Sequence, residues 1–177
     1  MIDEERFAAL VERERDALLG YALRRVPDPA DAADVVAETL LVAWRRGGDI
    51  PPGDRARPWL FGVARKVLLN QQRCERRRLA LADRLRSHLE LGPVPGSEDS
   101  ALDGAMQRLP EPDRELLRLL AWEELDAGAI AAVLGVPRGT VRVRLHRARR
   151  RLRAALDDER SAGHRSVTPL TPEESTS

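Results

Sequence analysis

The most regular hydrophobic pattern in the chain runs through residues 138–153. Apolar residues recur there at steps of four, three and four residues, at Val141, Leu145, Ala148 and Leu152. Such steps return to one side of an α-helix, so the pattern predicts a helix with a single buried stripe. Most of the positions between them are arginines: Arg138, Arg142, Arg144, Arg147, Arg149, Arg150 and Arg151. Because no acidic residue interrupts this stretch, it predicts a rigid cationic surface suited to a polyanion.

The residues before this stretch predict a shorter helix and a tight turn. Asp126 can cap that helix, whose apolar side carries Ile130, Val133 and Leu134. Gly135 can end it, because glycine takes the left-handed conformation at little cost, and Pro137 suits the first position of the next helix. Helix, glycine turn and cationic helix are typical of a helix-turn-helix, whose second helix enters the major groove of DNA. An ordinary helical hairpin with a basic flank is the alternative.

The first half of the chain begins with two segments of helical period. Residues 5–26 are expected to form one helix, with Phe7, Leu10, Leu18, Ala22 and Val26 turned inward. Asp28 can cap the next helix, and Pro29 suits its first position. The core stripe of this second helix is expected at Val36, Leu40 and Ala43. Its opposite face carries Asp34, Glu38, Leu41 and Arg45.

A long third helix is expected to begin at Pro58. Its buried side carries Leu60, Ala64, Val67 and Leu68. Another side carries a second basic stripe, made of Lys66, Asn70, Arg73 and Arg77. Trp59 and Phe61 lie near its start, where aromatic rings can stack on single-stranded bases. Core packing is the favoured interpretation for both rings, since a small helical domain needs bulky residues inside.

The rest of the chain divides into a linker, a second helical region and a tail. Glycine, proline and serine dominate residues 92–100, so we expect a flexible linker across 91–101. A helix is expected after Pro110, running through Leu116, Leu117, Leu120 and Ala121, with Trp122 sealing the core behind it. Residues 160–177 lack the apolar content to fold, and we expect them to be disordered. The sequence therefore predicts an all-helical protein with two small domains, at 1–90 and 102–159.

Composition narrows the classes of function. The net charge is only +1 over 177 residues, so the basic character is local. The single cysteine, Cys74, allows no intrachain disulfide, and the three histidines share no ligand spacing with it; we expect no metal site and no cofactor. No phosphate loop, nucleophile elbow or suitable carboxylate pair occurs, so we expect no catalytic residue and no enzyme. No run of eighteen apolar residues occurs, and the N-terminus is acidic; we expect a cytoplasmic protein with no membrane contact.

Three segments resemble, in order, the characteristic blocks of a known family. They are DAADVVAETLLVAWRR, RPWLFGVARKVLLNQQRCERRR and LPEPDRELLRLLAWEELDAGAIAAVLGVPRGTVRVRLHRARRRL, within residues 5–156. By these segments the chain is similar to extracytoplasmic-function (ECF) RNA polymerase sigma factors, the small two-domain members of the primary sigma family. The resemblance implies a first domain that docks on core RNA polymerase and captures the melted strand of the minus-ten element. It implies a second domain that reads the minus-thirty-five element of the promoter as duplex DNA.

The resemblance also implies roles for individual residues. The family contacts core polymerase at positions that correspond here to Asp34, Glu38 and Leu41. It meets the minus-ten strand at positions that correspond to Lys66, Asn70, Arg73 and Arg77. The recognition helix for the minus-thirty-five element carries Arg138, Thr140, Arg142, His146 and Arg147. Many relatives are held inactive by an anti-sigma factor, which is a further candidate partner.

Three positions depart from the family pattern. Lys66 stands where an asparagine often helps to hold a flipped base, and lysine offers donors and charge but no acceptor. Ala37 replaces a common glutamine, which removes one polar contact to core polymerase. Pro137 stands where a serine often caps the recognition helix, and little effect is expected there.

Other classes of function fit the sequence less well. A conventional helix-turn-helix regulator would bind paired half-sites as a dimer, yet no dimerisation zipper or ligand-binding domain is evident. An enzyme acting on nucleic acid would need motifs that the chain lacks. A pure polymerase adaptor would leave both basic stripes unused. A sigma factor should bind promoter duplex poorly alone and start transcription only with core polymerase, whereas a regulator should bind its operator unaided.

Overall fold

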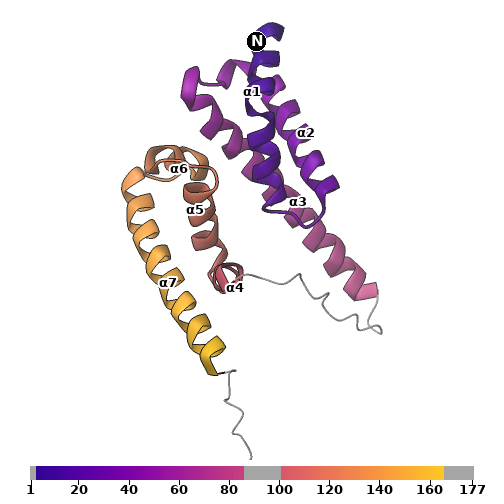
Figure 1. The fold of residues 1–177 in the computed structure, drawn as a ribbon. Coiled ribbons are helices and arrows are strands. Elements are labelled where there is room, and N and C mark those ends of the chain that lie inside the picture. Colours follow the sequence, from indigo (N-terminus) through magenta and orange to yellow (C-terminus); the bar gives the residue numbers. More distant parts are fainter. Residues whose placement is uncertain (1–2, 86–100, 166–177) are drawn as a thin grey trace, which may run out of the picture.

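The computed structural model describes residues 3–85 and 101–165. Within those ranges the long elements are all α-helices and no strand occurs, which confirms the all-helical prediction. One body contains α1 (Glu4–Leu23), α2 (Pro29–Arg45) and α3 (Ala56–Leu85), with short 3-10 turns at Gly47–Asp49 and Gly53–Arg55 between α2 and α3. The other contains α4 (Ala101–Gln107), α5 (Glu111–Ala121), α6 (Ala127–Leu134) and α7 (Arg138–Arg165) (Figure 1).

The core of the first body forms where α1 meets α3. Tyr21 of α1 stacks on Phe61 of α3, with ring centroids 4.9 Å apart and an interplanar angle of 12°. Both rings are fully buried, which confirms the core interpretation for Phe61. Glu14 of α1 is also buried and accepts a 2.6 Å hydrogen bond from Nε of Arg57 at the start of α3. This ion pair fixes the first turn of α3 on the middle of α1.

The sequence predicts the start of α2 correctly and the borders of its neighbours less well. The Asp28 carboxylate accepts a 2.8 Å hydrogen bond from the Ala30 amide, and Pro29 is the first helical residue. α1 ends at Leu23 rather than at residue 26. α3 begins at Ala56, two residues before Pro58. Proline is tolerated there because the first turn of a helix has no intrahelical partner for its N–H groups.

The core stripe of α2 is rotated by one position from the predicted one. Its buried residues are Ala32, Val35, Thr39 and Ala43. Val36 and Leu40, predicted at the centre of the stripe, are only partly buried against this core. A search for apolar residues does not assign Thr39 to the core, because threonine is polar. Its buried hydroxyl, however, donates a 2.7 Å hydrogen bond to the Val35 carbonyl. That bond satisfies the hydroxyl within the helix, so Thr39 can occupy a core position.

The second body contains the predicted helix-turn-helix. Asp126 caps α6, because its carboxylate accepts a 2.7 Å hydrogen bond from the Ala129 amide. Gly135 ends α6 in the left-handed conformation, with φ at 66°. Along α7 the predicted stripe is buried at Val141, Leu145 and Ala148, and Leu152 is partly buried. The cationic helix is therefore held by its apolar side, as its sequence predicts.

Two expectations for this body are wrong. Trp122 follows α5 with 44% of its surface exposed, so it does not seal the core; Leu119 and Leu125 are buried there. α7 continues to Arg165, so residues 160–165 of the predicted tail are helical. The remainder of that tail, 166–177, lies outside the described residues, as do residues 91–100 of the predicted linker.

The two bodies share one hydrophobic core. A single buried cluster includes residues of α1, α2 and α3 as well as residues of α5, α6 and α7. Within it α6 lies close to α3: a Cβ added to Gly62 of α3 would lie 3.6 Å from the carbonyl oxygen of Val133 in α6. A smaller cluster of Met106, Leu109, Leu117 and Ala148 joins α4 and α5 to α7. The helices that carry the two basic stripes are thus parts of one packed unit.

Candidate nucleic-acid interface

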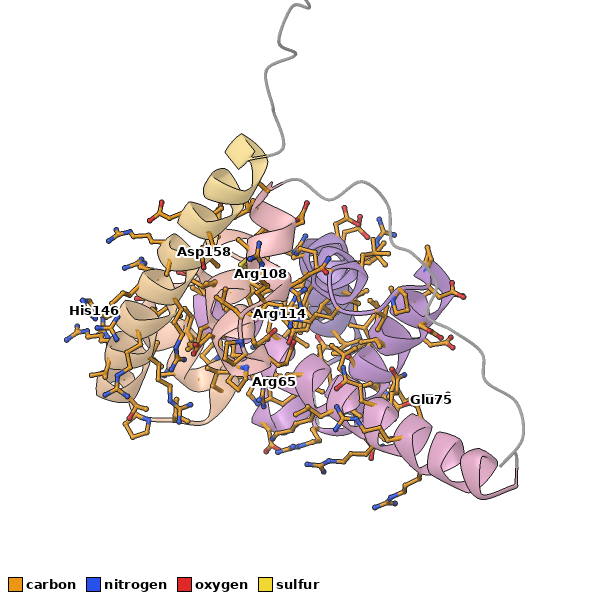
Figure 2. All side chains as sticks on the ribbon, turned by 90° about the horizontal axis from the view of Figure 1, so that it is seen from below. Arg65, Glu75, Arg108, Arg114, His146 and Asp158 are labelled. Carbon is orange, nitrogen blue, oxygen red and sulfur yellow. The ribbon has the colours of Figure 1, made fainter. Side chains whose placement is uncertain are left out.

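The outer side of α7 is a dense cationic surface. Of the predicted recognition residues, Arg138, Arg142, His146 and Arg147 are exposed, and Thr140 is partly buried. Figure 2 shows His146 on the side of α7 that points away from the rest of the molecule. Because Val141 and Leu145 are buried on the other side, α7 cannot rotate this surface away without losing its core contacts.

The first helix of the helix-turn-helix begins at a charged cap. The hydrogen bond from the Ala129 amide lowers the pKa of the Asp126 carboxyl, and a bond from Gly128 and the nearby Arg138 guanidinium act in the same direction. Asp126 is therefore ionised at neutral pH. This cap fixes the start of α6, and the charge of Arg138 brings the first residue of α7 close to the same carboxylate.

The second basic stripe follows the exposed side of α3. Lys66, Asn70, Arg73 and Arg77 are all exposed there. Lys66 lines a cavity of about 730 Å³ between α3 and the helix-turn-helix, together with Trp59 and Gly135. Trp59 is partly buried, and the Arg46 guanidinium lies 5.9 Å from its ring centroid. Of the two aromatic residues at the start of α3, only Trp59 remains accessible to a ligand.

The residues expected to meet core polymerase share one exposed face of α2. Asp34, Glu38 and Leu41 are exposed, and Leu41 is 47% exposed. The sequence interpretation misses Trp44, which lies three residues after Leu41 and is 43% exposed. The Trp44 ring packs edge-on against Phe7 of α1, with centroids 5.0 Å apart. The available signal was its helical spacing from Leu41, which places both large apolar side chains on neighbouring parts of this face.

A buried network of charges, which the sequence interpretation also misses, joins the two bodies. Arg25 donates to both carboxylate oxygens of Glu115 in α5, at 2.9 and 3.2 Å. Its Nη1 lies 3.0 Å from Glu123, which also accepts a 2.6 Å hydrogen bond from Arg24. The Tyr21 hydroxyl donates a 3.2 Å hydrogen bond to Glu115. Because the side chains of Arg25 and Glu123 are only 6% and 2% exposed, water screens these interactions weakly.

The protonation states in this network are fixed by its surroundings. Burial and the Glu115 carboxylate raise the pKa of the Tyr21 hydroxyl well above its ordinary value, so it remains a donor at neutral pH. Burial alone would lower the pKa of Arg25, but Tyr21 and Glu115 outweigh it and the pKa is raised. The only sequence signal for these contacts was the acidic excess within residues 111–126, and such an excess does not name a partner.

Residues 3–85 and 101–165 contain no group of three or more side chains that could hold a metal ion. Cys74 is exposed on α3 and unpaired. In the same part of the chain no helix is both long and apolar enough to cross a bilayer.

Two helical bodies with exposed basic helices, one of them in a helix-turn-helix, define a DNA-binding protein, and comparison with known proteins identifies both bodies. Residues 10–78 match the family model of sigma-70 region 2, and residues 99–152 match that of sigma-70 region 4. The ECF RNA polymerase sigma factor SigL of Mycobacterium tuberculosis is 36% identical over 158 residues, covering 85% of this chain and 88% of that protein. The RNA polymerase sigma-E factor of Streptomyces avermitilis is 32% identical over 156 residues, covering 85% of each chain.

Solved structures agree on the fold. CnrH, solved in complex with the cytosolic domain of CnrY, has a TM-score of 0.61 at 27% identity, covering 88% of this chain and 90% of that one. The sigma factor RpoE of Bartonella quintana, solved with the anti-sigma factor NepR, has a TM-score of 0.67 at 24% identity, covering 86% and 98%. The chain belongs to the family of ECF RNA polymerase sigma factors. It is a non-enzymatic subunit that binds core polymerase and promoter DNA to initiate transcription.

Proposed function

We propose that α7 reads the minus-thirty-five duplex, that the basic stripe of α3 binds the melted minus-ten strand, and that the exposed face of α2 docks on core polymerase. The observation that carries this proposal is the outer side of α7, a basic surface opposite a stripe that is buried at Val141, Leu145 and Ala148. The functional domains in this proposal are residues 1–90 and 102–159, joined by a linker at 91–101. Because the polymerase acts in the cytoplasm, we place the protein there.

The arginines of α7 are expected to make two kinds of contact, one that provides affinity for DNA and one that provides sequence selectivity. Contacts to phosphate supply binding without sequence information, whereas contacts to base edges supply choice. A guanidinium can donate two hydrogen bonds to O6 and N7 of one guanine in the major groove. Arg142 and Arg147 flank the outer side of α7 and are exposed, so they are our candidates for base reading. Exposed arginines nearer the end of the helix, such as Arg153, are candidates for phosphate contacts.

The stripe on α3 has the chemistry of a single-strand site. Lys66, Arg73 and Arg77 carry charge for successive phosphates, and the Asn70 amide can both donate to and accept from an unpaired base. The accessible ring of Trp59 offers a surface on which such a base can stack. Lys66 supplies donors only, so it favours a base edge that presents acceptors.

The face of α2 supplies an apolar centre for docking. Leu41 and Trp44 are each more than 40% exposed, although both are large apolar side chains. Their burial against a partner is favourable, and Asp34 and Glu38 give the surrounding surface an acidic character. The complementary surface on core polymerase is expected to be apolar at its centre and basic at its edge.

The shared core of the two bodies sets a condition on promoter binding. The two promoter elements lie about 25 base pairs apart, which is about 85 Å along the duplex at about 3.4 Å per base pair. Lys66 and Gly135, which belong to the two DNA-binding bodies, line one cavity. While the two bodies are packed together, the two DNA-binding surfaces cannot contact both promoter elements at the same time. The contact between the bodies must therefore open when the protein engages a promoter.

Runoff transcription with purified core polymerase on genomic promoter fragments tests the proposal. We expect start sites that appear only when core polymerase and this protein are both present. Leu41→Asp should abolish association with core polymerase, and Arg147→Ala should reduce initiation while leaving that association intact. Leu102→Asp is the matched control, since Leu102 is a similarly exposed leucine on α4. Equally selective promoter binding without core polymerase would instead favour a conventional helix-turn-helix regulator.

An anti-sigma factor remains our prediction for a further partner. RpoE of Bartonella quintana, which shares the fold of this chain, was solved with the anti-sigma factor NepR. Affinity purification of this protein from its own cells, followed by mass spectrometry, should recover core polymerase subunits and one small additional protein. Recovery of polymerase subunits alone would remove the anti-sigma factor from the proposal and leave the sigma assignment unchanged.

A further inference from the structure

Val143 is an apolar exception on the basic side of α7. It is 53% exposed, the highest value among the exposed large hydrophobic residues of the described chain. It lies two positions from both Val141 and Leu145, which are buried. Two residues correspond to about 200° around an α-helix, so Val143 points away from the stripe that holds α7 to its body.

Its neighbours on this outer side are the residues proposed to meet DNA. Gly139 lies one turn before Val143, and His146 and Arg147 lie one turn after it. A Cβ added to Gly139 would meet no atom within 4 Å, so the surface beside Val143 is open. Val143 therefore lies on the side of α7 that the proposed function turns toward the major groove.

The fold does not account for a valine at this position. Val143 belongs to neither hydrophobic cluster of the described residues. A single exposed valine on an ordinary helix would need no explanation. Val143, however, lies among arginines on a helix that is proposed to bind DNA. On such a surface an apolar side chain can contact an apolar group of a base. In the major groove the only apolar group of the bases is the C5-methyl of thymine.

We propose that Val143 determines specificity by packing against the C5-methyl group of a thymine in the minus-thirty-five element. The inference rests on the proposed role of α7. The arginines around Val143 donate hydrogen bonds, which do not distinguish a base with a methyl group from one without it. The two γ-methyl groups of valine can make van der Waals contact with that methyl group. Cytosine has no such methyl group, so Val143 favours thymine over cytosine at one position of the element.

Replacement of thymine by deoxyuridine tests this contact, since it removes only the methyl group and keeps base pairing and every hydrogen-bonding group. The assay measures binding of the complete polymerase, core plus this protein, to promoter duplexes that carry deoxyuridine at one minus-thirty-five position at a time. At one position we expect the wild-type complex to bind about four-fold more weakly, which is the effect of leaving one methyl group unburied. Val143→Ala should bind the thymine and deoxyuridine duplexes equally at that position.

Arg142→Ala is the control, because it should weaken binding to both duplexes and retain the four-fold ratio between them. Val143→Ala keeps its fold, since the side chain is exposed and alanine favours a helix. If Val143→Ala retains the wild-type ratio at every position, or if no position responds to deoxyuridine, the inference is overturned while the sigma function stands. If the wild-type complex binds equally well when the whole minus-thirty-five element is scrambled, the proposed role of α7 fails and the inference about Val143 fails with it.

Discussion

Arg25 and Glu115 lie ninety residues apart in the sequence and form a bidentate ion pair in the largely buried contact between the two bodies. The Arg25 guanidinium also lies 3.5 Å from the centroid of the Tyr21 ring, so the cation is enclosed by an aromatic face and two carboxylates. A buried pair of this kind contributes less to net stability than its short distances suggest, because both charges lose their water. Removal of one member, however, leaves the other charge buried and uncompensated. The pair therefore fixes the position of α5 against the segment that follows α1.

Replacement of Arg25 should separate the two bodies. Arg25→Met leaves the buried Glu115 carboxylate without its guanidinium partner and leaves Glu123 with Arg24 alone. Breaking a buried pair costs about 3–5 kcal/mol. Since the carboxylates regain water once the bodies part, we expect opening of the contact rather than unfolding. Small-angle X-ray scattering should give a larger radius of gyration for Arg25→Met, with unchanged helical circular dichroism. Arg15→Met is the control, because Arg15 is exposed and pairs with the adjacent Asp16. An unchanged radius for Arg25→Met would contradict the prediction.

The crossing of α3 and α6 gives a second way to open the contact, through volume instead of charge. At Gly62 an added Cβ would make ordinary van der Waals contact with the Val133 backbone at 3.6 Å. Gly62→Ala should therefore be accommodated, whereas Gly62→Leu adds three more carbons and should force α6 away from α3. Fluorescence energy transfer between labels on α2 and α4 should fall in Gly62→Leu and stay near the wild-type value in Gly62→Ala. Equal transfer in all three proteins would show that the bodies do not meet here in solution.

These two contacts also mark the limit of what the sequence could predict. Spacing and turn chemistry predict α7, its buried stripe, the Asp126 cap and the Gly135 turn, because each depends on residues a few positions apart. The exposure of the basic stripes follows from the same helical period. The pairing of Arg25 with Glu115 depends on how two separate bodies meet, and no local pattern encodes that. The sequence also gives no sign that Gly62 lies at a close contact, because that contact exists only where α6 packs against α3.

The remaining errors have local causes. The core stripe of α2 is rotated because Thr39 satisfies its own hydroxyl through the Val35 carbonyl, and a pattern of apolar residues passes over it. Trp122 is exposed because the chain leaves α5 at that residue, and Leu125 then turns back into the core. Size and apolar character alone suggested that Trp122 would seal the core. The direction of the chain after α5 instead leaves Trp122 exposed and buries Leu125.

Stability should depend on pH through Glu14. Burial raises the pKa of this carboxyl, but hydrogen bonds and charge from Arg13 and Arg57 outweigh it, and the pKa lies below its ordinary value. A carboxylate of this kind stabilises the fold above its unfolded pKa of about 4.3 and loses that effect as the pH falls through its folded pKa. Glu14→Gln should therefore lower the free energy of unfolding at neutral pH and approach the wild type in acid. Urea unfolding across the pH range measures this, with the exposed Glu12→Gln as control. A gap that stays constant into acid would assign the loss to packing.

Two glycines of the helix-turn-helix should respond to alanine with opposite signs. Gly135 has φ at 66° and open space around it, so Gly135→Ala meets only the backbone cost of the left-handed conformation, about 1–2 kcal/mol. Gly139 lies in the first turn of α7 with equal space, and Gly139→Ala should stabilise the helix by less than about 1 kcal/mol, the value that holds for a helix interior. Thermal unfolding should place the two variants on either side of the wild type. Destabilisation by Gly139→Ala would mean that α7 is strained at its start.

Base reading and phosphate binding on α7 should separate in a comparison of two arginine variants. If Arg147 reads a guanine, Arg147→Ala should cost about 1–3 kcal/mol on the matched minus-thirty-five element and little on a scrambled one. If Arg153 meets a phosphate, Arg153→Ala should weaken binding to both duplexes alike. It should also make the slope of log affinity against log salt shallower by about 0.9, because one fewer counterion is released. Both quantities come from titrations of the complete polymerase at several salt concentrations. Equal losses on matched and scrambled elements for Arg147→Ala would assign Arg147 to the backbone, and Arg142 would become the remaining candidate for the guanine contact.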